Sequence, residues 1–459
     1  MITLRLLASI QLVTAFIWAI DLPPEPKLPS DVCIELEANI KESPVGYIPE
    51  ADESNLDTVR IQEALDYCRS GRTVKLIKGK GNAFLTSHLR VPSGVSLWID
   101  EGVTLFASRD PREYDVGFAY SCGNVYYGIE GCLPLISVKY GRGNGIFGDG
   151  VIDGRGGQKM IDSNETWWEL ALRAKSLRAE HSSPRLIVVE NSEDFVLYRI
   201  RLHNSPFWHF ATEAVVGLTV WGVKVDTPSI AYPEHLHARN TDGFDPNGRN
   251  MVFTQCYIKC GDDSIAIKAK KFPVENVLIQ DNHFYNGHGV SIGSEINEGA
   301  LNVTVRNLTI DNAQNGLRIK SDSSKGGNVR GVVYENICIR NTEDLLVFDT
   351  YYTNLNDSKI PNFHDIHITN TRLISSPNRT AIFRGYNKET PLKIYLDNVV
   401  SDIEVNDLTT LNVEITLGPG EVVGIPFKED VSTNVKIFRR DGKKTPPIDC
   451  SNAFVPFPR

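Results

Sequence analysis

Short runs of apolar, β-branched residues separated by Gly, Asn and Asp make up most of this chain. Within them one pattern recurs: an apolar residue, two spacers, a second apolar residue, one spacer and a third. Copies start at Leu197, Val220, Phe253, Ile279, Val305, Tyr334 and Ile368, with Asn282 and Thr371 replacing the middle apolar residue in two of them. Strand-only repeats whose copies start roughly 20 to 50 residues apart, as these do, predict a parallel β-helix.

Other repeat folds fit this spacing less well. A β-propeller needs longer units of about 40 to 50 residues, and leucine-rich repeats need a helix or a leucine ladder in each unit. Separate sandwich domains would lack a common period. Although 459 residues would ordinarily suggest about three domains, we expect a single all-β domain over residues 20–459.

Two segments have helical periodicity instead. In the first, Asp57 is the expected N-cap, Ile61, Leu65 and Cys68 recur on one face, and Gly71 is the expected stop. We expect this helix to cap the N-terminal end of the stack. The second candidate spans Thr166–Glu180.

A second family of strands aligns Ile265–Lys268 with Val290–Gly293 and Leu317–Lys320, in steps that match the period of the repeat. Equivalent residues in successive coils lie about 4.8 Å apart, the spacing between strands. Polar residues at the starts of these strands and within them are therefore expected to gather on one face.

The N-terminus has the features of a secretory signal, with Arg5 followed by an apolar stretch over residues 6–20 that is too short to span a bilayer comfortably. We expect cleavage near Ala19, so residues 1–19 form the signal and the mature protein is secreted. A membrane anchor is the alternative interpretation of this stretch.

Charge and cysteine content fit that interpretation. A net charge of −9 argues against nucleic-acid and anionic-membrane partners. Eight cysteines suit an oxidising compartment, and we expect the pairs Cys33–Cys68 and Cys122–Cys132. A zinc site is not indicated, because the chain has no CxxC pair and Cys256 and Cys260 lie in an apolar strand pattern. Five sequons fit a glycoprotein: Asn164, Asn302, Asn307, Asn356 and Asn378.

Three carboxylates fall on or beside the predicted ladder. Asp262 and Asp263 are adjacent at a strand start, and Asp242 lies one connection earlier. Carboxylates held close together raise the pKa of one of them, so that one can act as an acid while another activates water, as glycoside hydrolysis requires. Asp-rich turns between short strands would also explain these residues.

A histidine and two cations follow in register. His288 follows Asp262 by close to one coil and lies between two glycines, which allow close approach of a ligand. Arg318 and Lys320 come one coil later on the same strand face and suit a substrate carboxylate. A turn histidine and solvated strand cations are the plainer alternatives, but the joint occurrence in register is far more specific than any one member.

Four segments together resemble the signature of the polygalacturonases, glycoside hydrolase family 28. They are Asn240-Thr241-Asp242, Gly261-Asp262-Asp263, Gly287-His288-Gly289 and Arg318-Ile319-Lys320. The resemblance covers about residues 93–374 and implies a right-handed parallel β-helix. It also implies inverting hydrolysis of α-1,4-galacturonosyl bonds in pectin without metal or other cofactor.

The resemblance also implies roles for individual residues. Asp262 would be the general acid, while Asp242 and Asp263 would activate the water. For an inverting reaction, the carboxyl of Asp262 should then lie roughly 6.5 to 9.5 Å from the carboxyls that hold this water. His288 would support the protonation state of the site. The expected substrate-binding residues are Asn240, Arg318, Lys320 and Tyr351.

Departures from the family pattern refine the expected activity. Ser264 follows the paired aspartates where many members have Cys, and Gly243 follows Asn-Thr-Asp where many endo-acting members have Ala. The resulting segment, Gly243-Phe244-Asp245-Pro246, resembles exo-acting members. The Trp167-Trp168 region adds bulk that would close one end of a cleft. We therefore expect a monomeric exo-polygalacturonase acting on polygalacturonate.

Other activities remain open at this point. Within the family, the alternatives are endo-acting hydrolysis and hydrolysis of xylogalacturonan or rhamnogalacturonan. Outside it, they are a pectin-binding β-helix without activity and a calcium-dependent pectate lyase.

Overall fold

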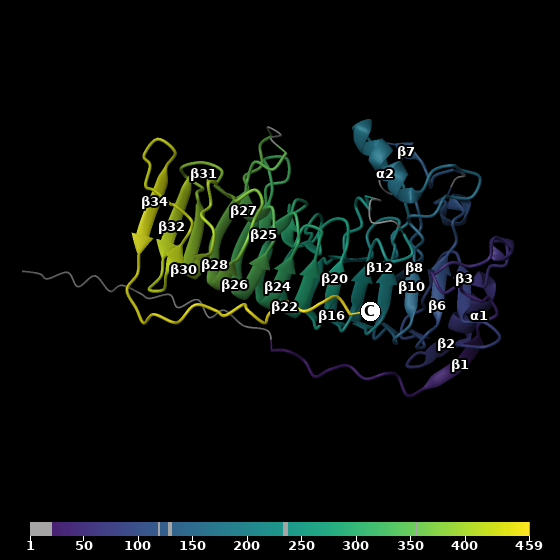
Figure 1. Cartoon of the computed structure of the whole chain (residues 1–459). Helices are drawn as coiled ribbons and strands as arrows, with labels where there is room; N and C mark the ends of the chain where they lie inside the picture. Colours follow the sequence, from purple (N-terminus) through teal and green to yellow (C-terminus); the bar gives the residue numbers. More distant parts are fainter. Residues whose placement is uncertain (1–20, 118–119, 127–130, 233–236, 354–356, 459) are drawn as a thin grey trace, which may run out of the picture.

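The computed structural model describes residues 21–117, 120–126, 131–232, 237–353 and 357–458. The chain winds into a stack of coils whose strands pair in parallel, which confirms the predicted right-handed parallel β-helix (Figure 1). The expected signal segment, residues 1–19, lies outside the described residues. In the described ranges, no helix has the length and apolar character needed to cross a membrane.

The coils build three parallel ladders of strands. The first contains β1 (Val32–Glu37), β2 (Thr73–Ile77), β5 (Ser96–Ile99), β9 (Gly145–Phe147), β13 (Glu193–Tyr198), β16 (Val215–Trp221), β19 (Gly248–Thr254), β22 (Val274–Tyr285), β24 (Ala300–Asp311), β26 (Asn328–Arg340), β28 (Asn362–Leu373), β30 (Leu392–Ser401), β32 (Val413–Leu417) and β34 (Val435–Arg439). The second contains β3 (Ala83–Thr86), β6 (Thr104–Ala107), β10 (Val151–Asp153), β14 (Arg201–His203), β17 (Lys224–Asp226), β20 (Tyr257–Lys259), the later halves of β22 to β30, and β33 (Val422–Val423).

The third ladder is a separate 11-stranded sheet, and it carries the predicted site. It contains β4 (Leu89–Arg90), β8 (Ile136–Lys139), β12 (Ile187–Glu190), β15 (Phe210–Glu213), β18 (Phe244–Asp245), β21 (Ile265–Ile267), β23 (Val290–Gly293), β25 (Asn315–Lys320), β27 (Asp344–Asp349), β29 (Thr380–Arg384) and β31 (Asp407–Leu411).

The repeat predicted from the sequence matches the strand register of the first ladder. Its seven starting residues form six successive in-register pairs, from Leu197–Val220 to Tyr334–Ile368, and all seven are fully buried. Asn282, which breaks the apolar pattern, is also fully buried. Its side chain bonds the backbone of Cys256 and Phe253 in the preceding coil, so its polarity is satisfied.

Asparagines whose backbone has a left-handed conformation, with positive φ, form side-chain hydrogen bonds from one coil to the next. Asn307 donates through Nδ2 to Asp281 at 2.8 Å, and Asn302 donates in the same way to Asn276 at 2.8 Å. Asn302 and Asn307 are sequon asparagines, and Nδ2 is the atom that would carry a glycan. A glycan on either therefore competes with this ladder, even though Asn307 is exposed. Asn164 and Asn378 are exposed as well. Asn356 lies outside the described residues.

Helix α1 (Thr58–Tyr67) lies at the N-terminal end of the stack, as predicted (Figure 1). Its buried face contains Ile61 and Leu65. Asp57 occupies the N-cap position, but its side chain bonds Arg60 and the backbone of Leu85 rather than the helix N-terminus. The helix also ends before the expected stop at Gly71, because Cys68 adopts an extended conformation.

Helix α2 (Trp167–Ser176) is shorter than the predicted Thr166–Glu180 and begins with a capping box formed by Thr166 and Glu169. Beside it, β7 (Val125–Tyr126) and β11 (Glu180–His181) form a small antiparallel ladder. Figure 1 shows α2 and β7 projecting from the stack. Trp167 and Trp168 are 0% and 1% exposed, so they anchor this projection rather than line a cleft themselves.

The structure confirms both predicted disulfides, Cys33–Cys68 and Cys122–Cys132. It adds Cys338–Cys450, across a sequence separation of 112 residues. This third bond holds the C-terminal segment as it runs back along the stack (Figure 1). Cys256 and Cys260 are buried free thiols.

Candidate active site

The outer face of the third sheet carries the site, because strand side chains alternate between the core and solvent. Leu317 and Ile319 of β25 point into the core, and Arg318 and Lys320 point to the other side. Arg318 pairs in register with Ser291, and Lys320 pairs with Gly293. The strand alignment predicted from sequence is therefore correct, and it places residues from β21 to β25 side by side.

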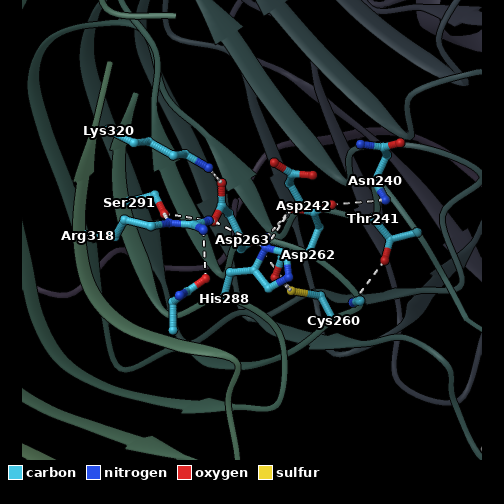
Figure 2. A network of polar contacts seen from close by, with 12 residues as sticks. Asn240, Thr241, Asp242, Cys260, Asp262, Asp263, His288, Ser291, Arg318 and Lys320 are labelled. Carbon is cyan, nitrogen blue, oxygen red and sulfur yellow. Dashed lines mark hydrogen bonds and ion pairs between the residues drawn. The ribbon is translucent and has the colours of Figure 1, made fainter. Parts of the chain in front are cut away.

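Asp263 is the centre of a polar network (Figure 2). Its Oδ1 accepts bonds from Arg318 Nη2 and, at 2.7 Å, from Ser291 Oγ, while Oδ2 accepts from Lys320 Nζ at 2.9 Å. Burial works to raise the pKa of Asp263, but the charges of Lys320 and Arg318 outweigh it and lower the pKa strongly. Asp263 is therefore an ionised carboxylate.

The two cations differ from their expected arrangement. Arg318 and Lys320 are only 6% and 5% exposed, and both are directed at Asp263. Arg318 also donates to Ser291 and, at 2.6 Å, to Asn315. In this structure Arg318 and Lys320 both hold Asp263. Their contact with a substrate carboxylate stays a prediction.

Asp262 forms a pair with the predicted histidine. His288 Nδ1 lies 3.0 Å from Asp262 Oδ1, and the backbone N–H of His288 donates to the carbonyl of Asp262. Burial works to raise the pKa of Asp262, but the hydrogen bond and charge of His288 outweigh it and lower the pKa. The contact places His288 where it can exchange a proton with Asp262.

Asp242 has the opposite electrostatics. It is 3% exposed, and its Oδ1 has no hydrogen-bond partner among the described residues. Burial, followed by the negative charges of Asp245 and Asp262, raises the pKa of Asp242 well above its usual value. Burial and the neighbouring negative charges therefore favour the protonated form of Asp242, whereas the pKa of Asp262 and of Asp263 is lowered.

Sequence reasoning missed a second acidic neighbour and its cation. Asp245 is 1% exposed, and burial raises its pKa to about 7. Lys268 Nζ lies 3.5 Å from Asp245, 4.0 Å from Asp242 and 3.3 Å from Glu295, and it lies over the Trp208 ring. The sequence does contain a signal for both residues, because Asp245 closely follows the Asn-Thr-Asp segment and Lys268 ends one of the aligned strands.

Asn240 joins the network from its edge. Its backbone N–H donates to Asp262 Oδ2 at 3.3 Å, and its side-chain Oδ1 lies 3.4 Å from Nε2 of His181. His181 belongs to β11, so the projecting α2 region reaches the predicted site. No sequence signal connected His181 to Asn240, because the contact joins an insertion to the stack.

Tyr351 is the one predicted site residue outside this network. It follows β27, and its hydroxyl donates to the carbonyl oxygen of Tyr386 in the next coil. The other seven residues, Asn240, Asp242, Asp262, Asp263, His288, Arg318 and Lys320, lie together in Figure 2.

Asp262 and Asp263 lie close together because adjacent residues at a bend supply both carboxyls. One oxygen of Asp262 and one of Asp263 lie within 4.8 Å of each other. The separation between Asp262 and a water site shared by Asp242 and Asp263 stays a prediction.

A divalent metal does not fit this carboxylate cluster. Asp262, Asp263 and His288 bring three ligand atoms together. However, Arg318 and Lys320 already bind both oxygens of Asp263. A metal there would face two buried positive charges.

The comparisons with known proteins agree with this geometry. The model of Glycosyl hydrolases family 28 matches residues 128–399, which span all seven clustered residues. This chain belongs to that family. It is 40% identical to "Polygalacturonase" of Ralstonia solanacearum, covering 94% of this chain and 92% of the relative. It is 39% identical to "Endo-polygalacturonase" of Pectobacterium parmentieri, covering 86% and 92% of the two chains.

Solved structures give the same assignment. The polygalacturonase from Erwinia carotovora ssp. carotovora superposes with a TM-score of 0.70 at 32% identity, over 93% of this chain and 99% of that one. An exopolygalacturonase from Thermotoga maritima has a TM-score of 0.67 at 19% identity, over 90% of this chain and 93% of that one, which shows the fold alone. The chain is thus a family 28 glycoside hydrolase with the predicted fold.

Gly243, which resembled exo-acting members, has a packing explanation. A Cβ at this position would lie 2.5 Å from the carbonyl oxygen of Ser264 and 2.9 Å from Ile258 Cγ2. Both contacts are too short, so this coil requires glycine whatever the mode of attack. The residue itself therefore does not distinguish exo from endo action.

Proposed function

We propose that this family 28 hydrolase cleaves α-1,4-galacturonosyl bonds of polygalacturonate, the acidic polymer of pectin. One observation carries the proposal: three carboxylates, a histidine and two cations meet on one sheet face, in the order and register that the family signature predicts. The names of the relatives from Ralstonia and Pectobacterium support the substrate class.

In the proposed reaction, Asp262 protonates the departing glycosidic oxygen. His288, 3.0 Å away, shares and replaces that proton. Asp263 remains ionised beside Arg318 and Lys320, so its charge is available to activate a water molecule together with Asp242. The attacking water gives its proton to Asp263, the carboxylate whose pKa is strongly lowered, while Asp242 orients that water by a hydrogen bond.

We further propose exo attack, with α2 and the β7–β11 ladder forming a wall at one end of the substrate site. A cavity of about 510 Å³ lies over the third sheet and is lined by Leu133, Arg185, Trp208, Asp245 and Lys268, among others. A cavity of that size suits a terminal segment of a polymer better than its middle.

Endo attack is the second candidate. The Pectobacterium relatives, 39% identical over 82% and 86% of this chain, are named endo-polygalacturonases. Since packing explains Gly243, the exo proposal depends on the wall and on the remainder of the Gly243-Phe244-Asp245-Pro246 segment.

Product analysis on polygalacturonate tests both proposals, namely hydrolysis of the polymer and exo attack. Exo action yields galacturonic acid as the only small product from the earliest time points, with slow loss of viscosity. A ladder of oligomers with rapid loss of viscosity would overturn exo attack and leave the hydrolase intact. The absence of new reducing ends would favour a pectin-binding protein instead, and an ultraviolet-absorbing product lost on calcium chelation would indicate a lyase.

We also propose that the protein is secreted and monomeric. Three disulfides support an oxidising destination. Sequencing the N-terminus of secreted material tests cleavage near Ala19, and an intact Met1 in the medium would contradict it.

A further inference from the structure

A further cation lies on the outer face of the third sheet, beyond the acid–base centre. Lys320 pairs in register with Asp349, and Asp349 pairs with Arg384. Arg384 thus lies two coils beyond Lys320. Lys268, which follows the Ile267–Ile292 pair, lies two coils before it. Cations recur on this face at every second coil, a spacing of about 9.6 Å from two strand separations.

Arg384 is reachable, unlike the cations of the acid–base centre. Its side chain is 28% exposed, compared with 6% for Lys320. One guanidinium nitrogen pairs with Asp349 Oδ2, whose other oxygen accepts the backbone N–H of Tyr351 at 2.9 Å. An arginine has five N–H donors, and Asp349 is the only ion-pair partner of Arg384 among the described residues, so donors are left for a ligand.

Two tyrosine rings accompany this arginine. The guanidinium lies over the Tyr351 ring, 5.8 Å from its centroid. Tyr351 in turn stacks on Tyr386, with centroids 5.9 Å apart and an interplanar angle of 24°. The hydroxyl of Tyr351 donates a hydrogen bond to the backbone carbonyl of Tyr386, which ties the Tyr351 ring to the next coil. The result is a half-buried aromatic surface beside an accessible cation.

This combination matches the chemistry of an acidic sugar. Each galacturonate unit carries one carboxylate, which an arginine binds through charge-assisted hydrogen bonds. The C–H face of its ring packs on an aromatic side chain, which supplies rigid apolar area. Neither the acid–base chemistry nor the packing of the core uses Arg384 and Tyr386.

We propose that Arg384 and Tyr386, together with the Tyr351 ring, bind a galacturonate unit of the polymer two coils beyond Lys320. This inference rests on the proposed function, since it extends the same substrate site. The subsite lies four coil spacings, about 19 Å, from the level of Asp262. A digalacturonate bound across the acid–base centre does not reach it, whereas a long chain does.

Chain-length dependence tests the proposal. In Arg384→Gln, we expect KM for polygalacturonate to rise about tenfold, as loss of a charge-assisted hydrogen bond predicts, with kcat and the kcat/KM for digalacturonate unchanged. Arg384→Lys should give an intermediate KM, and Tyr386→Ala should raise KM on the polymer only. The matched control is Arg372→Gln, which breaks a comparable Arg–Asp pair with Asp402 on another face and should leave both substrates unaffected.

Two results would overturn this subsite. One is an unchanged KM on the polymer in Arg384→Gln. The other is an equal loss on digalacturonate and polymer, which would mean that Arg384 only supports the fold. Failure of the proposed function is separate, because the wild-type protein would then release no reducing ends from either substrate. An endo product pattern would leave the subsite test valid.

Discussion

Replacing Arg318 by Gln tests whether this cation acts through Asp263. The sequence predicts an arginine that binds the substrate carboxylate, so its loss would raise KM. In the structure the guanidinium is 6% exposed and bonds Asp263, Ser291 and Asn315. We therefore expect Arg318→Gln to act mainly on kcat, because it removes contacts that hold Asp263 in position.

The magnitude follows from the contacts. An opposite charge in direct contact lowers a carboxyl pKa by on the order of 1 to 3 pH units. Lys320 remains at 2.9 Å in the variant, so the rise in the pKa of Asp263 should lie toward the lower end of that range. Breaking a buried pair costs about 3 to 5 kcal/mol of stability, and the remaining Lys320 should reduce this to about 2 to 3 kcal/mol.

The assay is the pH profile of kcat and kcat/KM on polygalacturonate, with thermal unfolding as the measure of stability. We expect a lower kcat with little change in KM. Because the pKa of Asp263 is strongly lowered in the wild type, a rise of about 1 pH unit leaves Asp263 ionised and the acidic limb in place. Arg318→Lys is the matched control, because it keeps the charge beside Asp263. A rise in KM with kcat unchanged would refute this reasoning and restore the substrate-clamp interpretation.

Two further substitutions address the carboxyls. Asp262→Asn removes the proton donor, so kcat should fall by about 10² to 10⁴-fold while KM changes little, and near-normal turnover would reject its role as the acid. Asp245→Asn tests the buried carboxyl whose pKa is raised to about 7. Such a group binds more protons in the folded state than in the unfolded state, so the wild type should lose up to about 4 kcal/mol of stability between pH 4 and 7 that the variant keeps. Parallel stability–pH curves would contradict this linkage.

The coil register was predictable from sequence because each coil buries its apolar residues against the same positions of its neighbours. One period therefore locates a whole ladder, and the pairing of Leu197 with Val220 follows from their position in the repeat. The alignment of Val290 with Leu317 then brought Arg318 onto the face occupied by Ser291. Both steps use only strand alternation and a constant spacing.

Interactions between side chains in different coils were not predictable in the same way. The sequence places Arg318 and Lys320 on the correct face, but it does not show that both turn back to Asp263 instead of outward. That outcome depends on the depth of the site, which sets the burial of the cations. The repeat contains no information on depth.

Segments outside the repeat were the hardest to place. Cys338–Cys450 joins a strand to a C-terminal segment that has no periodic pattern, so no spacing connected the two cysteines. Trp167 and Trp168 looked like bulk for closing a cleft, yet they are the first two residues of α2 and are buried. An apolar residue in an insertion predicts burial better than it predicts which surface the insertion covers.

The most direct test of the central claim is proton NMR of polygalacturonate during digestion, with the wild type and Asp262→Asn compared under the same conditions. We expect the wild type to give new reducing-end signals, with the β-anomer appearing before the α-anomer and no signal from an unsaturated sugar. We expect almost no product from the variant. Initial appearance of the α-anomer would contradict single displacement. An unsaturated product, or equal product from the variant, would contradict hydrolysis by this carboxylate site.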